Sequence, residues 1–152
     1  MTPPQLAFLF EAQVHVAAPI EMGPGPNGAH RVIPITGGIV TGPRINGIVL
    51  PGGADWQWIR PDGAAEIEAR YIIETNDGAR INVVNRGLRH GPPAVLQRLA
   101  AGLPVDRAEY YFRTTPVFQT AAPRYEWLTK SVFVATGERH PNHVLLQFWE
   151  VQ

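Results

Sequence analysis

The chain contains no cysteine, a single serine and no excess of either charge. Without cysteine, disulfides, thiolate metal ligands and thiol nucleophiles are all excluded. The one serine, Ser131, lies outside any Gly-x-Ser-x-Gly sequence, which disfavours a Ser–His–Asp hydrolase. Lys plus Arg and Asp plus Glu are equal at 13 each. Nucleic-acid-binding proteins usually carry an excess of basic residues, so nucleic acid is not expected as a partner of this chain.

Long apolar runs are also missing, since no stretch approaches the ~20 residues that span a bilayer. The first residues, 1–6, lack the basic start of a signal peptide. We therefore expect no membrane partner and take the cytoplasm as the default location. The 152 residues, 45% of them apolar, suffice for a single domain over 1–152 with its own core.

Glycine and proline are abundant, at 15 residues each, and they stand between apolar runs rather than inside them. This punctuation is typical of many short strands joined by turns. Residues 6–16 alternate between apolar and polar side chains, which predicts a strand with one buried face. The Pro- and Gly-rich stretch 17–29 is expected to be a long loop. Further strands are predicted over 31–35, 39–41, 44–50, 54–60, 64–75, 79–86, 108–114, 117–121, 131–136 and 143–151.

One short helix is predicted over 93–101, where proline stands near the start and Gly102 follows the end. The fold class is therefore all-β, with roughly nine to eleven antiparallel strands that close into a barrel or form a sandwich. Glycines inside or beside strands, such as Gly38 and Gly47, favour the single closed barrel because curved sheets need such positions. A sandwich is the alternative.

Neither a metal nor another cofactor is expected. The run 23–28 is rich in glycine but lacks the Lys-Ser/Thr pair and the strand–helix setting of a phosphate loop. His140 and His143 are spaced like a metal pair, yet the sequence around them reads better as a turn that enters the last strand. No dinucleotide fingerprint is present.

The candidate site consists of charged and aromatic residues on otherwise apolar strands. Asp55, Tyr111, Arg70 and Arg113 are the candidate catalytic residues, and Trp56 and Trp127 are expected to supply an apolar wall. If the barrel encloses a pocket, both arginines should project into it and hold a carboxylate, phenolate or enolate oxygen, with Asp55 nearby. The alternatives are a salt bridge that joins two strands, or side chains that simply face solvent.

Several ordered motifs suggest a family. They are Pro34-Ile-Thr-Gly-Gly, Gly42-Pro-Arg-Ile-Asn-Gly, Leu50-Pro-Gly-Gly-Ala-Asp-Trp-Gln, Asp62-Gly, Ala69-Arg-Tyr, Asn76-Asp-Gly, Tyr111-Phe-Arg-Thr, Phe118, Trp127-Leu and Thr136-Gly. Over residues 31–151 the chain resembles the uncharacterised bacterial proteins grouped as the domain of unknown function 3237. The resemblance implies a small β-barrel, and its motifs include Asp55, Arg70 and Arg113.

Two positions depart from the pattern expected for that family. Gln119 stands where such proteins often have Glu, and Thr129 stands where Asn often follows Trp-Leu. Both are candidate substrate-binding residues together with Trp56 and Trp127, and the differences would suit a different substrate or the loss of an acid–base group.

Two functions remain open. The first is a cofactor-independent enzyme, of lyase, isomerase, cyclase or hydratase type, that acts on a hydrophobic or aromatic small molecule. It would use Asp or Tyr for acid–base chemistry and Arg to hold an oxyanion. The second is a carrier of an apolar ligand, like the lipocalins. A homodimer is expected, because a chain without net charge has little electrostatic repulsion between copies.

Overall fold

The computed structural model describes residues 1–152, whose ten strands form one antiparallel sheet. A helix, α1 (Pro93–Ala100), follows β7, and two short 3-10 helices cover Arg107–Glu109 and Pro123–Thr129. No helix has the length and apolar character needed to cross a bilayer. The strands are β1 (Leu6–Val16), β2 (Ile20–Gly25), β3 (Gly28–Thr41), β4 (Gly47–Val49), β5 (Ala54–Ile59), β6 (Ala65–Thr75), β7 (Arg80–His90), β8 (Tyr111–Gln119), β9 (Val132–Arg139) and β10 (His143–Val151).

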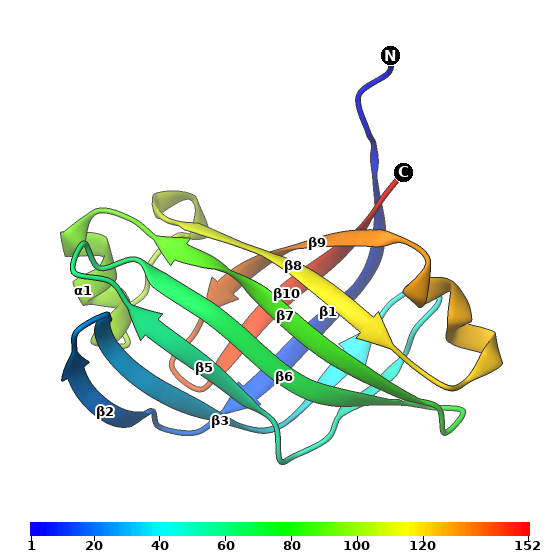
Figure 1. Ribbon diagram of the computed structural model, residues 1–152, viewed down its shortest axis with the longest axis horizontal. Coiled ribbons are helices and arrows are strands. Elements are labelled where there is room, and N and C mark those ends of the chain that lie inside the picture. The colour runs from blue at the N-terminus through cyan, green and yellow to red at the C-terminus, as the bar shows by residue number, and fades with distance from the viewer.

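The sheet closes on itself, so the predicted barrel is confirmed (Figure 1). Strands follow one another in the order β1-β10-β9-β8-β7-β6-β4-β3, and β3 pairs back with β1. The short strands β4 and β5 both bridge β3 and β6, and β2 pairs with β3 alone. The result is an eight-stranded closed barrel with two additional strands.

Residues 31–35 and 39–41, which were predicted as separate strands, belong to one continuous strand, β3. Its first half pairs with β2 and β5 and its second half with β1 and β4, so Gly37 and Gly38 bend a continuous strand rather than end one. Their φ angles are 150° and 154°, and a Cβ on Gly38 would lie 2.3 Å from the Gln13 carbonyl oxygen. Only glycine permits that approach.

The expected loop over 17–29 is instead mostly the hairpin of β2 and β3. Proline is tolerated there because β2 has a neighbour on one side only, and a missing N–H donor at a sheet edge breaks no ladder bond. Strand β8 likewise runs through Pro116, which lies beyond the short stretch of β8 that pairs with β9.

The two ends of the barrel differ. The 3-10 helix Pro123–Thr129, drawn in orange, closes one end, and α1 flanks the other (Figure 1). A core of twenty buried residues includes Phe10, Phe118, Phe133 and Phe148, and the rings of Phe10 and Phe148 stack at 4.4 Å. A smaller cluster of six buried residues packs Val95 and Leu99 of α1 against β6 and β8. Between the two clusters the lumen is open.

Candidate functional site

The open part of the lumen is a cavity toward the α1 end of the barrel. It offers about 60 Å³ to the centres of water-sized molecules, several times the roughly 10–15 Å³ that one water needs. More than half of the lining residues are apolar. The polar ones come from five strands and the β9–β10 turn: Asp55, Gln57, Tyr71, Asn85, Arg89, Thr114, Arg139 and His140.

The strand register brings these side chains together. Asp55 on β5 lies opposite Ala69 on β6, and Ala69 lies opposite Asn85 on β7. In the next row, Gln57 lies opposite Ile67, which is opposite Gly87. Ala69, the residue between Asp55 and Asn85, is small, so no large side chain fills the space between these two polar groups.

A chain of hydrogen bonds holds one side of the Asp55 carboxyl group. Arg31 donates from Nε and Nη2 to Gln57 Oε1, at 2.9 and 2.8 Å. Gln57 in turn donates from Nε2 to Asp55 Oδ2 at 2.6 Å. Gln57 is only 1% exposed, so its amide is fixed by these bonds and orients the carboxyl group.

Four buried polar atoms along the cavity have no hydrogen-bond partner: Asp55 Oδ1, Tyr71 Oη, Asn85 Oδ1 and Thr114 Oγ1. Unpaired buried polar atoms are rare and costly in native proteins, at about 1–3 kcal/mol each. Because the four atoms line one cavity, a water molecule or a ligand that enters it can form hydrogen bonds with them.

The environment of Asp55 raises the pKa of its carboxyl group. Burial raises the pKa of this carboxyl group, and the hydrogen bond from Gln57 and the charges of Arg89 and Arg31 only partly oppose the rise. Burial, and then the negative charge of Asp55, raise the pKa of the Tyr71 hydroxyl. The carboxyl group and the phenol can therefore each offer a proton to a bound molecule.

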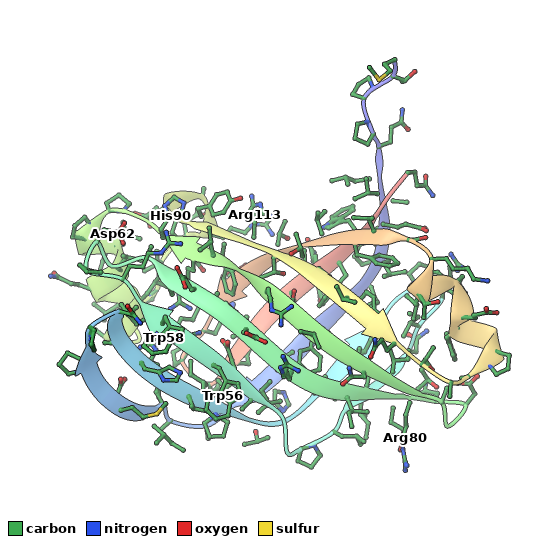
Figure 2. The ribbon with its side chains drawn as sticks, viewed as in Figure 1. Trp56, Trp58, Asp62, Arg80, His90 and Arg113 are labelled. Carbon is green, nitrogen blue, oxygen red and sulfur yellow. The ribbon has the colours of Figure 1, made fainter.

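Of the four predicted catalytic residues, one lines the cavity and three lie on the outer face of the barrel. Asp55 lines the cavity as expected, but the expectation that Arg70 and Arg113 project into it is wrong. Arg70 lies on the outer face of β6, where its Nη2 is 2.6 Å from Glu68 Oε1. Arg113 lies on the outer face of β8, as Figure 2 shows. Tyr111 shares that face, because alternate residues of a strand point the same way and Phe112, between the two, is buried.

None of the four predicted substrate-binding residues lines the cavity. Trp56 is 46% exposed on the outer face of β5, which Figure 2 shows, and Gln119 is exposed at the end of β8. Trp127 and Thr129 belong to the 3-10 helix at the opposite end of the barrel. There the Arg44 guanidinium lies 3.6 Å from the Trp127 ring centre, and Thr129 donates to the Glu126 carbonyl at 2.7 Å.

Sequence reasoning missed Gln57, Tyr71, Asn85, Arg89 and Thr114. A signal for two of them was present, because Asn85 and Arg89 are in phase with the apolar pair Ile81 and Val83 on β7. On a strand, residues in phase share one face.

The histidines His140 and His143 stack at 4.3 Å between ring centres, and they belong to no group of three possible metal ligands.

Comparison with known sequences identifies relatives along the whole chain. The family described as a protein of unknown function (DUF3237) matches residues 4–151. A UPF0311 protein of Rhodopseudomonas palustris is 42% identical over 152 residues, which are 99% of each chain. A hydroalkoxylation enzyme of Penicillium herquei is 26% identical over 151 residues, 99% of this chain and 86% of that protein.

Solved structures agree with the barrel. A conserved protein of unknown function from Rhodopseudomonas palustris superposes with a TM-score of 0.95 at 39% identity over both complete chains. A β-barrel-like protein from Acinetobacter baumannii gives 0.88 at 38% identity, over 100% of this chain and 98% of that one. An enzyme from Penicillium herquei gives 0.76 at 25% identity, over 100% and 97%.

Proposed function

The chain belongs to the DUF3237 family of proteins of unknown function. We propose that it is an enzyme of acid–base chemistry. Its substrate would be a small, largely apolar molecule bound in the lumen, and its reaction the addition of a hydroxyl group across a carbon–carbon double bond, or the reverse elimination. The observation that carries this proposal is the Asp55 carboxyl group. Gln57 holds its Oδ2, while its Oδ1 is buried, unpaired and part of the cavity lining.

The chemistry requires a proton donor in an apolar setting. In the addition, the proton on Asp55 Oδ1 would pass to one alkene carbon, and the hydroxyl oxygen of the substrate would bond to the other. The hydroxyl proton would then return to Asp55. Atoms and charges balance without an oxidant, and a carboxyl group whose pKa is raised by burial is suited to the first step.

Two lines support this choice of reaction. The hydroalkoxylation enzyme of Penicillium herquei is a relative over almost the entire chain, and its name describes addition of a hydroxyl to an alkene. The raised pKa of Asp55 follows from its own surroundings in this protein and does not depend on that relative.

The second candidate is a carrier of apolar ligands, which the apolar majority of the cavity lining favours. A carrier of a purely apolar ligand has no use for a carboxyl group whose free oxygen is buried without a partner. The four unpaired polar atoms therefore weigh toward the enzyme.

The test uses phenols that carry an ortho-alkenyl chain, incubated with the protein in D₂O and analysed by mass spectrometry. We expect cyclic isomers with one deuterium on carbon, and Asp55→Asn should reduce their rate of formation by about 10²-fold or more. Glu66→Gln, an exposed carboxylate paired with Arg60, is the matched control and should retain the rate. Binding without turnover would support the carrier, and equal rates for Asp55→Asn and the unchanged protein would refute the role of Asp55.

A further inference from the structure

Three arginines converge at the α1 end of the lumen. Arg31 comes from β3, Arg89 from β7 and Arg139 from the end of β9. Arg89 and Arg139 line the main cavity, and all three line a second space of about 240 Å³ between the barrel and α1. The cluster therefore connects the lumen with the region beneath the helix.

The positive charge of this cluster is poorly balanced inside the protein. Arg31 is engaged by Gln57, and its Nη1 lies 3.9 Å from the exposed Glu21 carboxylate. Asp55 and, to a smaller extent, Tyr110 are the acidic groups that act on Arg89, and burial raises the pKa of Asp55. Glu138, next to Arg139 in sequence, pairs with His140 at 3.2 Å instead.

Arg89 is the least satisfied of the three. The residue is 5% exposed, and its guanidinium has neither a hydrogen bond nor an ion pair with another side chain. Its Cζ lies 5.7 Å from the centre of the Phe112 ring. Burial first, then repulsion from Arg139 and Arg31, lowers the pKa of Arg89 to about 9. A buried guanidinium in this state gains strongly from an anion.

We propose that Arg89 and Arg139 form an oxyanion-binding subsite, so that the ligand of the lumen is an organic anion with an apolar body and a carboxylate or phosphate group. The inference deepens the proposed function, and it rests on that proposal only in taking the ligand to be the substrate. Carboxylate and phosphate present the same oxygen chemistry to two guanidinium groups.

The position of the subsite relative to Asp55 sets the length of such a ligand. Asn85 is level with Asp55 across the sheet, and Arg89 lies four residues further along β7 toward α1. Four residues of strand span roughly 13 Å, and the length of the arginine side chain can shorten the gap. A molecule with its anionic group at the α1 end would thus place a carbon skeleton of about one aromatic ring or more beside Asp55.

Equilibrium binding of inert probes tests the subsite apart from catalysis. Isothermal titration would compare 3-phenylpropanoate, phenyl phosphate and the neutral 3-phenylpropanamide with the unchanged protein. The proposal predicts that at least one anion binds and that the amide binds at least about tenfold more weakly. The tighter of the two anions identifies carboxylate or phosphate as the natural group.

Variants then locate the binding. Arg89→Met and Arg139→Met should each weaken binding of the anion at least about tenfold, whereas Arg86→Met should leave it unchanged. Arg86 lies on the same strand as Arg89 but on the outer face, paired with Glu68, so it is the matched control. Thermal melts followed by circular dichroism verify that each variant is folded. If Arg89→Met does not fold, the binding measured with Arg139→Met decides the test.

Equal affinity for the acid and the amide, no binding of either anion, or unchanged anion binding by the folded variants would overturn the subsite. The proposed reaction would survive that result if Asp55-dependent turnover of neutral alkenyl phenols persisted. The reverse result, anion binding without turnover, would retain the subsite and remove the reaction.

Discussion

Two aspartates, Asp77 at one end of the barrel and Asp55 inside the lumen, have opposite surroundings. Asp77, in the β6–β7 turn, accepts hydrogen bonds from the Thr75 hydroxyl, from the Tyr125 hydroxyl at 3.0 Å and from Arg124 Nη1 at 3.0 Å. These bonds, that from Thr75 foremost, lower the pKa of Asp77. Asp55 has one hydrogen-bonded oxygen and one bare oxygen, and burial raises its pKa.

The difference separates a carboxylate that holds the fold together from a carboxyl group kept for another molecule. At the Asp77 end every partner is supplied by the chain itself, and the aromatic core fills the lumen. At the α1 end the chain leaves polar atoms and a guanidinium without partners around a cavity. Groups of this kind cost stability in the empty protein and gain it back only on binding.

The largest contrast is expected from truncations in the two halves of the lumen. Phe148→Ala should lower the free energy of unfolding by about 3–5 kcal/mol, because the buried ring stacks on Phe10. Thr114→Val, which removes an unpaired hydroxyl beside the cavity, should change it by less than about 1 kcal/mol. Urea denaturation measures both. Similar losses for the two variants would mean that the cavity is packed as tightly as the core.

A smaller effect of opposite sign is expected at Arg89. Replacing this buried, unpaired guanidinium by Met should raise the free energy of unfolding by about 1–3 kcal/mol. Arg124→Met, at the other end, removes an exposed ion pair and should lower it by less than about 1 kcal/mol. Thermal melts in low salt would show the difference, and a destabilised Arg89→Met would reveal a structural partner for Arg89.

The smallest change is a pH dependence with opposite sign for the two aspartates. Because the folded pKa of Asp55 is raised, unfolding releases a proton between the ordinary Asp pKa and the folded one, and stability falls as pH rises through that window. Asp55→Asn should therefore match the unchanged protein in acid and exceed its stability at neutral pH.

Asp77 should behave in reverse. Its folded pKa is lowered, so its contribution is complete above the ordinary Asp pKa and is lost as pH falls through the folded value. Asp77→Asn should be less stable than the unchanged protein at neutral pH, with a deficit that shrinks in acid. Melting temperatures between pH 3 and pH 7 would check both variants, and parallel curves would remove the contrast between the two ends.

The sequence predicts the barrel, the helix after β7 and Asp55 in the site, because alternation and turn residues are local signals. It fails for Arg70 and Arg113, which were expected inside although Arg70 is in phase with Glu66 and Glu68 on β6. A charge in the middle of a strand suggested a function, but the alternation already placed it on the outer face.

Strand β5 shows why the rest was out of reach. Its tryptophans, Trp56 and Trp58, face outward, and the polar Asp55 and Gln57 face the lumen, which inverts the usual rule. Only the cross-strand register, which aligns Asp55 with Ala69 and Asn85, reveals this. Likewise the meeting of Arg31, Arg89 and Arg139 depends on barrel closure, which brings together strands far apart in the chain.

The most direct test of the account is the titration of Asp55 itself. Protein labelled with ¹³C at the aspartate carboxyl groups, with Asp55→Asn and Asp77→Asn to assign the two signals, can be followed by NMR from acid to neutral pH. We expect Asp55 to titrate above the ordinary value of 3.8 and Asp77 to titrate below it. An Asp55 that titrates at or below 3.8 would be a charged structural carboxylate, and the role proposed for it would be wrong.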